Sequence, residues 1–315
     1  MKDEKKPLVI IAGPTASGKS GLSVLLAEKI NGEIISADSM QVYRHMDIGS
    51  AKITAREMKG IPHHLIDILE PFEDFNVALF QKLAKQAMDE IYSRGRTPIL
   101  VGGTGFYIQS VLYDIDFTEE ETDFTYRKSL EELADTRGFE ALFERLKAVD
   151  PASAAELHPN NVKRVIRALE YYHLTGQKIS EHNKEQRKKS SPYDAFYFVL
   201  NMDRKKLYER IDQRVDLMIQ NGLVEEVKHL KEMGLSHKNV SMQGLGYKEI
   251  LAFLDGDCSL EEAIYTIKRD TRHFAKRQLT WFRREPDAIW LDCDPDTRTP
   301  EELLKEIIQN HLFQK

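Results

Sequence analysis

The chain has 315 residues, of which 41% are hydrophobic and 30% are charged, and its net charge is −6. These values indicate a globular protein with room for a second lobe, and the acidic balance argues against a protein that coats itself in nucleic acid. No apolar stretch approaches the roughly 18 to 20 residues that a membrane span needs, and residues 1–6 lack a signal-peptide core, so we expect a cytoplasmic protein without membrane contact. The two cysteines are too few for a disulfide framework or a cysteine-based zinc site.

The apolar run at residues 8–12 leads into the pattern G-x-x-x-x-G-K-S, between an expected strand and an expected helix. Backbone N–H groups in such a turn form a concave anion site, to which Lys19 adds a positive charge. Ser20 is placed to hold a magnesium ion (Mg2+) that bridges phosphate oxygens. A nucleoside triphosphate is the usual ligand, but any diphosphate with magnesium meets the same requirements. The predicted phosphate-binding residues are Gly13, Pro14, Thr15, Ala16, Ser17, Gly18, Lys19 and Ser20.

A second strand, over residues 33–37, ends at Asp38. Ligands of open parallel sheets lie beyond the carboxyl ends of the strands, so Asp38 should face the same crevice as the phosphate-binding loop. Asp38 is therefore a candidate metal ligand or general base, and a helix cap is the alternative. The polar segment 38–52 that follows either binds a ligand or merely connects. His63 and His64 are adjacent in an extended segment and point to opposite faces, so we expect structural histidines rather than a metal site.

The next strand, over residues 98–101, runs into Gly102, Gly103 and Thr104. ATP hydrolases with this type of loop usually place an aspartate at the end of such a strand. Two glycines predict close approach of the backbone to a ligand, and Thr104 offers one hydroxyl. Hydrolysis of ATP is therefore the weaker interpretation.

From about residue 116 the sequence is charged and helical, and strand character returns at residues 195–200. We predict an α/β fold in which helices flank a parallel sheet like that of P-loop NTPases, with an inserted all-helical domain. The core would comprise residues 1–115 and 192–315, the latter with C-terminal helices, and the insertion residues 116–191. Two basic clusters, at residues 163–189 and 268–284, are suited to a phosphate backbone, although each alone is equally consistent with a solvated helix face.

The chain resembles the tRNA dimethylallyltransferases, a family related through its phosphate loop to small kinases. Short matching segments run in one order along nearly the whole chain. Ser50 stands where threonine is commoner, and the cysteine- and histidine-bearing extension of eukaryotic relatives is missing, which favours a bacterial-type enzyme. Besides the phosphate loop, the matches are Asp38-Ser39 with Gln41 and Tyr43, residues 46–49, 63–67, 101–104, 150–154, 158–160, 167–170 and 276–281.

The resemblance implies transfer of a dimethylallyl group from dimethylallyl diphosphate to N6 of the adenosine 3′-adjacent to the anticodon in tRNA, with release of diphosphate. By this resemblance Asp38 would bind the adenine amine and accept its proton. Arg127 would bind the diphosphate with its positive charge, and Thr104 would place a hydroxyl near the target base or the leaving oxygen. These three residues are the expected catalytic residues of a protein that we expect to be a monomer.

The resemblance also requires tRNA contacts, because a stacked adenine must be flipped into a channel to reach a buried diphosphate. We expect the insertion and the basic helices to hold the RNA backbone. The candidate contacts are Asp38, Ser39, Met40, Gln41, Thr104, Arg127, Lys163, Arg164, Val165, Ile166, Arg167, Gln243, Gly244, Gly246 and Lys248.

Three alternatives stay open. A small-molecule kinase would explain the loop and magnesium but leave the basic insertion without a role, and it would consume ATP. A non-catalytic RNA-binding protein would not explain Asp38 beside a complete phosphate loop. An adenylate isopentenyltransferase has the same donor and chemistry but uses free AMP or ATP, and the basic insertion favours tRNA over a mononucleotide.

Overall fold

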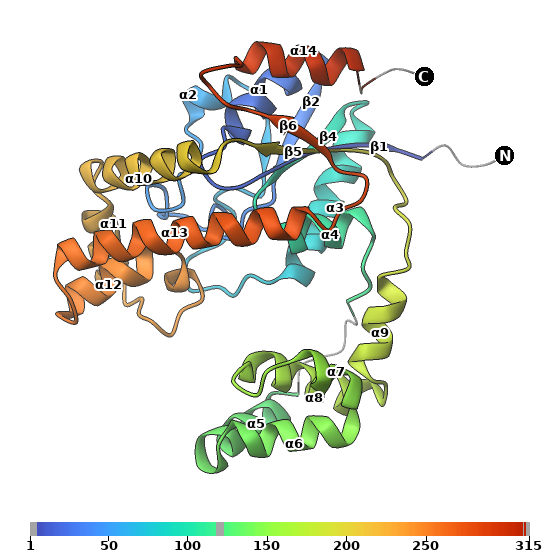
Figure 1. The fold of residues 1–315 in the computed structure, drawn as a ribbon, viewed down its shortest axis with the longest axis vertical. Coiled ribbons are helices and arrows are strands. Elements are labelled where there is room, and N and C mark those ends of the chain that lie inside the picture. The colour runs from blue at the N-terminus through green and yellow to red at the C-terminus, as the bar shows by residue number, and fades with distance from the viewer. Residues whose placement is uncertain (1–4, 118–122, 311, 313–315) are drawn as a thin grey trace. The chain divides into compact units, whose positions relative to one another are not determined.

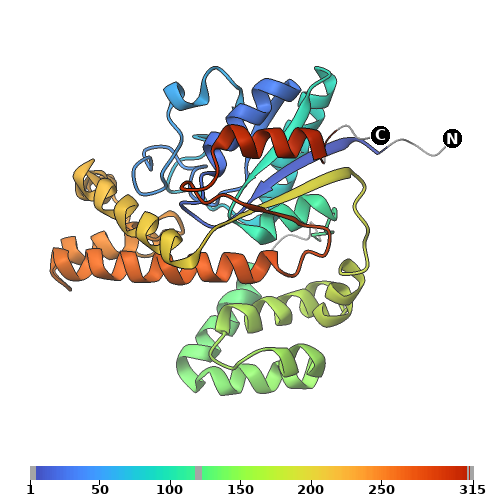
Figure 2. The same ribbon diagram turned by 45° about the horizontal axis from the view of Figure 1, so that its top comes forward.

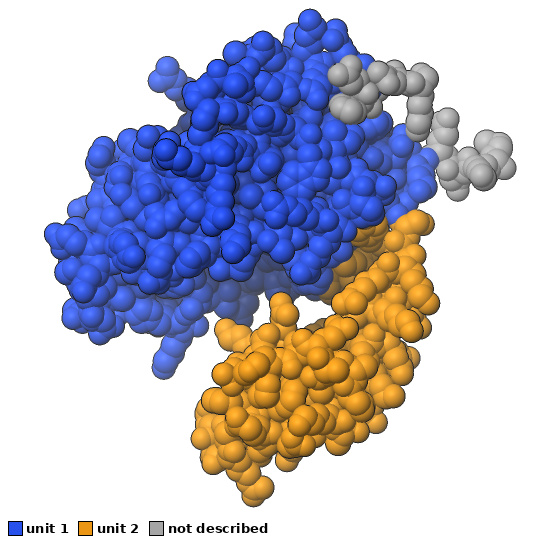
Figure 3. All heavy atoms as spheres, viewed as in Figure 1, with its two compact units in different colours: residues 1–112, 191–315 blue, residues 113–190 orange. Residues whose placement is uncertain are grey.

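The computed structural model describes residues 5–117, 123–310 and 312. The chain divides into two compact units, which Figure 3 shows in different colours: residues 1–112 with 191–315, and residues 113–190. The predicted insertion spans residues 116–191. The structure assigns residues 113–115 to the inserted unit as well, and residue 191 to the first unit.

The first unit is built on a sheet whose paired strands all run parallel. In the described residues the sheet has six strands in the order β3-β2-β4-β1-β5-β6 (Figure 1). The predicted α/β fold is confirmed, and the first and fifth strands along the chain lie side by side although the inserted unit separates them in sequence. The strands are β1 Pro7–Ala12, β2 Gly32–Ser36, β3 His63–His64, β4 Thr97–Gly102, β5 Asp194–Asn201 and β6 Ile289–Asp292.

Helices cover both faces of this sheet (Figure 1). Side chains alternate along a strand, so Val9 and Ile11 of β1 join the core beneath α1 and α14, while Leu8 and Ile10 are buried on the opposite face. The helices α10 and α13 pack side by side (Figures 1 and 2). The helices of this unit are α1 Lys19–Ile30, α2 Ala55–Met58, α3 Val77–Ser93, α4 Gly105–Leu112, α10 Arg204–Gln220, α11 Leu223–Glu232, α12 Tyr247–Asp255, α13 Leu260–Phe282 and α14 Pro300–Asn310, with a short 3-10 helix at Ser241–Gln243.

The second unit is helical throughout its described residues. Its core gathers Leu130, Leu142, Leu146 and Leu169 from three helices. The buried carboxylate of Asp150 accepts four hydrogen bonds. Ser153 and Ser180 each donate one from the backbone N–H and one from the hydroxyl, and these bonds fix the starts of α7 and α9. The helices are α5 Phe124–Arg137, α6 Phe139–Val149, α7 Pro151–Glu156, α8 Val162–Thr175 and α9 Ile179–Gln186.

No helix in the described part of the chain is both long and apolar enough to cross a lipid bilayer.

Candidate active site

The phosphate-binding loop follows β1 as the sequence predicts, and α1 begins at Lys19. Gly13 has a φ of 151°, and a Cβ there would stand 2.9 Å from the carbonyl oxygen of Leu200, so only glycine fits. The N–H groups of Gly18, Lys19 and Ser20 donate to no acceptor among the described residues. These groups are available to an anion, and the anion site that the pattern predicts stays a prediction.

Lys19 points back over this loop, and its Nζ donates to the carbonyl oxygen of Pro14 at 2.7 Å. Burial and the nearby charge of Arg214 lower the pKa of Lys19 to about 8, although the Asp38 carboxylate opposes the shift. The hydroxyl of Ser17 is buried and has no partner among the described residues. A bound anion would raise the pKa of Lys19 and give the loop the partner that it lacks.

Asp38 lies at the carboxyl end of β2, partly buried beside the loop. Its Oδ1 accepts the backbone N–H of Met40 at 2.8 Å and more weakly that of Gln41 at 3.4 Å, so the residue also holds a turn. No donor in the described residues contacts Oδ2. Burial raises the pKa of Asp38 above its ordinary value, against the lowering effect of the two N–H groups and of Lys19.

Three neighbouring strands bring Asp38, Thr104 and the phosphate-binding loop to one edge of the sheet. Because β2, β4 and β1 are adjacent, Asp38, Thr104 and the phosphate-binding loop all follow adjacent carboxyl ends. The N–H of Thr104 donates to the carbonyl oxygen of Ala37 at 3.4 Å. Thr104 is partly exposed, at the start of α4.

The two glycines before Thr104 admit protein atoms at close range. A Cβ on Gly102 would stand 2.2 Å from the carbonyl oxygen of Ala37, and one on Gly103 would stand 2.1 Å from Nε2 of Gln278. Both residues also line a cavity. The two glycines thus make room for the chain itself, and close approach of this backbone to a ligand stays a prediction.

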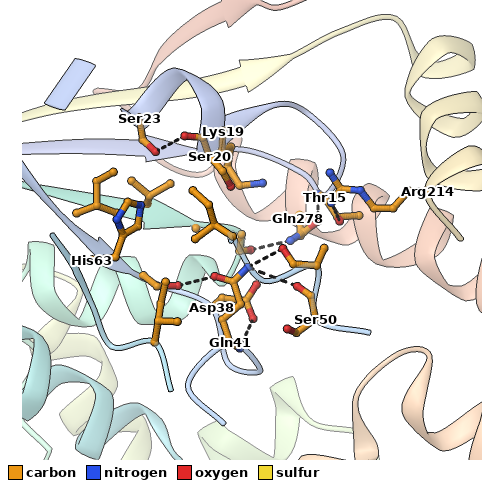
Figure 4. A pocket seen from close by; sticks show the side chains of 18 of the residues that line it. Thr15, Lys19, Ser20, Ser23, Asp38, Gln41, Ser50, His63, Arg214 and Gln278 are labelled. Atoms are coloured by element: carbon orange, nitrogen blue, oxygen red, sulfur yellow. Dashed lines mark hydrogen bonds between the residues drawn. The ribbon is translucent and has the colours of Figure 1, made fainter. Parts of the chain in front are cut away.

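That cavity is shown in Figure 4, with Asp38 and Gln41 on one side and Lys19 with Ser20 on another. Its apolar wall includes Ile34, Ile53, Ile66, Val101 and Phe274. A cavity with a carboxylate, two cations and an apolar wall can take a small apolar group attached to a polyanion.

Two arginines that the sequence analysis did not single out hold the loop from outside, together with Gln278 of the matched segment 276–281. Arg210 and Arg214 of α10 contact it, Arg210 Nε donating to the carbonyl oxygen of Ala16 at 2.9 Å and Arg214 lying 3.5 Å from the hydroxyl of Thr15. Gln278 of α13 bonds the loop as well. Neither arginine meets a carboxylate in the described residues, and burial together with Arg210 lowers the pKa of Arg214. The spacing of four residues between the two arginines was the available sequence signal.

Known proteins resemble the chain over nearly its whole length. A family model described as IPP transferase matches residues 41–285, and one described as isopentenyl transferase matches residues 6–75. The chain is similar to a tRNA dimethylallyltransferase of Lachnoclostridium phytofermentans, at 61% identity over 311 residues that cover 98% of this chain and 99% of the relative.

Two solved structures are also similar. The full-length tRNA isopentenylpyrophosphate transferase from Bacillus halodurans has 48% sequence identity and a TM-score of 0.72, with 96% of each chain covered. A eukaryotic dimethylallyltransferase acting on tRNA has 32% identity and a TM-score of 0.85, covering 96% of this chain and 78% of the other. The chain belongs to the IPP transferase family.

In this IPP transferase, two of the predicted tRNA-contact segments adjoin one another. A Cβ on Gly244 would stand 2.6 Å from Cε of Met40, so the two segments are in contact at these residues. Gln41 is turned inward, where its Oε1 accepts a hydrogen bond from the Ser36 hydroxyl at 3.0 Å. Gln243 is exposed and donates to the carbonyl oxygen of His237, Gly246 is buried, and Lys248 lies 3.4 Å from the carboxylate of Glu249.

The predicted contacts on α8 divide into two sets. Lys163, Arg164 and Arg167 are exposed. Val165 and Ile166 are 0% and 3% exposed in the core of the second unit, so the prediction that they contact tRNA is wrong for both side chains. The helical period turns apolar positions to the core while their basic neighbours face solvent.

Arg127 of this IPP transferase lies on α5 in the second unit. Its Nε lies 3.2 Å from Glu131, and one terminal nitrogen lies 3.3 Å from the buried carboxylate of Glu170. The two carboxylates therefore fix the orientation of the Arg127 side chain within the second unit. Its action on the diphosphate stays a prediction.

Proposed function

We propose that the chain transfers a dimethylallyl group from dimethylallyl diphosphate to N6 of the adenosine on the 3′ side of the anticodon in tRNA, releasing diphosphate. Membership of the IPP transferase family and the names of its relatives support this reaction. The observation that carries the proposal is the cavity that Asp38 lines together with Lys19 of the phosphate-binding loop and Arg214 of α10. Such a cavity supplies a base for the amine and a site for an anionic leaving group.

The diphosphate would be bound by the free N–H groups of the loop, Lys19 and Arg214. Their positive charge lies where negative charge grows as the bond between the prenyl carbon and the diphosphate oxygen breaks. Ser20 is exposed at the start of α1, and among the described residues no three His, Cys, Asp or Glu side chains cluster to hold a metal. A single hydroxyl ligand from Ser20 fits Mg2+, which binds through few protein ligands together with phosphate oxygens. When bound, the ion would neutralise charge on the diphosphate.

Asp38 would act as the general base. The adenine N6 attacks the prenyl carbon, the carbon–oxygen bond breaks, and the proton of N6 passes to the free Oδ2 of Asp38. A raised pKa makes this carboxylate a stronger base than an ordinary aspartate. The two N–H groups on Oδ1 keep its other oxygen oriented.

The tRNA would lie on two basic surfaces. On α13, Lys268 and Arg272 are paired with Asp216 and Asp212 of α10, so this part of the basic cluster is neutralised. The C-terminal end of the cluster is exposed and meets no carboxylate in the described residues. It comprises Lys276, Arg277, Arg283 and Arg284.

Aromatic rings accompany these charges. Arg284 lies 5.6 Å over the ring of Trp281, which meets the exposed ring of Phe106 edge-on at 6.0 Å. Positive charges interleaved with aromatic rings suit an RNA strand with unstacked bases. The second basic surface is the exposed side of α8. We also expect the protein to work as a monomer in the cytoplasm.

The direct test offers radiolabelled dimethylallyl diphosphate and magnesium together with unmodified tRNA, AMP or ATP. We expect label in tRNA alone. Asp38→Asn should lower kcat by about 100- to 10,000-fold, the range for loss of a general base, without weakening tRNA binding. Asp257→Asn, the same change at an exposed site on the first unit, serves as the matched control.

Three results would contradict the proposal. Label in AMP or ATP would assign a free nucleotide as the acceptor, and consumption of ATP without label transfer would indicate a kinase. Equal losses of turnover and tRNA affinity in the Asp38 variant would remove the base role.

The pH dependence supplies a second readout. Because burial raises the pKa of Asp38, the base form should be lost at a higher pH than for an ordinary aspartate as the solution is acidified. The wild-type kcat should therefore fall as the pH decreases through this raised pKa. The residual kcat of Asp38→Asn should not show this fall with decreasing pH.

A further inference from the structure

The side chain of Gln278 joins two parts of the active site. Its Oε1 accepts the backbone N–H of Thr15 in the phosphate-binding loop at 3.0 Å, and its Nε2 donates to the carbonyl oxygen of Gly103 at 3.0 Å (Figure 4). Gln278 is 6% exposed. One buried amide thus spans the loop that follows β1 and the turn that follows β4.

A side-chain amide satisfies both partners. A backbone N–H only donates and a carbonyl only accepts, so the bridging group needs one acceptor and one donor. A glutamate would set its carboxylate against the Gly103 carbonyl, and a lysine would set its ammonium against the Thr15 N–H. The absence of a Cβ at Gly103 completes the fit, because that atom would stand 2.1 Å from Nε2.

The bridge also determines which groups of the loop remain for a ligand. The N–H of Thr15 is occupied by Gln278, and Arg210 holds the neighbouring carbonyl of Ala16. The first half of the loop is therefore fixed by the protein, whereas the N–H groups of Gly18 to Ser20 are free of acceptors in the described residues. Gly103 directly precedes Thr104. The same amide therefore links the phosphate-binding loop, including the half with free N–H groups, to the turn that carries Thr104.

We propose that Gln278 is a positioning residue that sets the diphosphate-binding loop against the turn that carries Thr104. This proposal rests on the proposed prenyl transfer. Gln278 itself lines the cavity, but both polar atoms of its amide are bonded to the protein. Its loss should misplace bound diphosphate relative to the acceptor, and a misplacement of about 1 Å lowers rates by about 100-fold.

The experiment measures steady-state kinetics with dimethylallyl diphosphate and an unmodified anticodon stem-loop, together with RNA affinity and thermal unfolding. Gln278→Glu keeps the acceptor and removes the donor, and Gln278→Ala removes both. Gly103→Ala displaces the amide without altering Gln278. Gln86→Glu makes the same charge change on the exposed side of α3 as a matched control.

We expect Gln278→Glu and Gly103→Ala each to lower kcat/KM for the diphosphate by about 10- to 100-fold, with RNA affinity unchanged. If the two residues act through one bond, Gly103→Ala should cost little more in the Gln278→Ala background. Unchanged kcat/KM in folded variants would overturn the proposal. A loss of RNA affinity alone, or fully additive effects of the two substitutions, would overturn it as well.

Failure of the proposed function and failure of the positioning role give different results. If wild-type protein transfers no label to RNA, the proposed function fails before any variant is compared. If wild type is active, only the positioning role is at stake. Should Gln278→Glu fail to fold, Gly103→Ala still decides the result, since it acts from the opposite side of the same hydrogen bond.

Discussion

A buried carboxylate outside the cavity shows how single residues stabilise the sheet. Glu33 of β2 is 1% exposed, and it meets Arg94 through two hydrogen bonds of 3.0 and 2.8 Å, Arg96 at 3.0 Å and His64 at 2.7 Å. Burial alone would raise its pKa, but hydrogen bonds from Arg94 and His64 outweigh that effect and lower the pKa to about 2. His64 is thus a structural histidine, as its sequence context predicts, whereas His63 lines the cavity.

This ion cluster predicts a pH-dependent stability. The pKa of Glu33 falls from the ordinary 4.5 to about 2 on folding, so its contribution is complete above pH 4.5 and is lost as the pH decreases toward 2. Glu33→Gln should lower the free energy of unfolding by about 3 kcal/mol at pH 7 and by clearly less at pH 3. Urea unfolding at both pH values measures this, with the exposed Glu28→Gln as control. A difference that does not change with pH would contradict the assignment.

At the scale of elements, the cavity wall is held by helices far along the chain. Glu226 of α11 accepts the successive backbone N–H groups of Asp47, Ile48 and Gly49 at 2.9, 2.8 and 3.1 Å, and also the hydroxyl of Tyr247 at 2.8 Å. The next residues of that loop, 50 and 51, line the cavity. The polar segment 38–52 therefore contributes to the cavity wall, and its binding of a ligand stays a prediction.

Removal of this anchor should loosen one loop and leave the fold intact. Glu226→Ala deletes four hydrogen bonds to a charged acceptor, so we expect residues 46–50 to lose about 3 kcal/mol of protection in amide hydrogen exchange. The KM for dimethylallyl diphosphate should rise in parallel. Glu232→Ala, at an exposed position on the same helix, should change neither quantity. Protection that persists in the Glu226 variant would show that other contacts hold the loop.

At the scale of the whole molecule, the chain consists of two units with separate cores. In the described part of the chain, the buried apolar residues of 113–190 form a cluster of their own, and those of the sheet form another. A substitution in one core should therefore affect the stability of that unit. The α8 helix offers a sharp contrast, because buried and exposed side chains alternate along it.

Ile166→Ala should lower the stability of residues 113–190 by about 2 to 5 kcal/mol, the usual cost of a buried isoleucine, without altering hydrogen exchange in the sheet. Arg164→Ala, two residues away and exposed, should leave stability unchanged and weaken tRNA binding, with a smaller dependence of affinity on salt. Hydrogen exchange and titrations at two salt concentrations separate these effects. Equal destabilisation by both variants would contradict the division of α8 into a core side and a solvent side.

Local patterns in the amino-acid sequence predict the parts of this protein that depend on neighbours in the chain. Apolar runs indicate the strands, the spacing of glycines and Lys19 indicates the phosphate-binding loop, and the carboxyl end of a strand places Asp38 beside it. The helical period also turns Val165 and Ile166 toward a core, which is the physical reason that their side chains are not available to tRNA.

Contacts between distant segments depend on the three-dimensional fold. Gln278 reaches Thr15 across 263 residues, and Arg210 reaches Ala16 across 194. These contacts require α10 and α13 to lie beside the loop, which follows from the pairing of β1 with β5 and from helix packing, neither of which has a local sequence period. For the same reason Gly103 signals close approach in the sequence, but only the folded chain identifies Gln278 as the side chain that approaches.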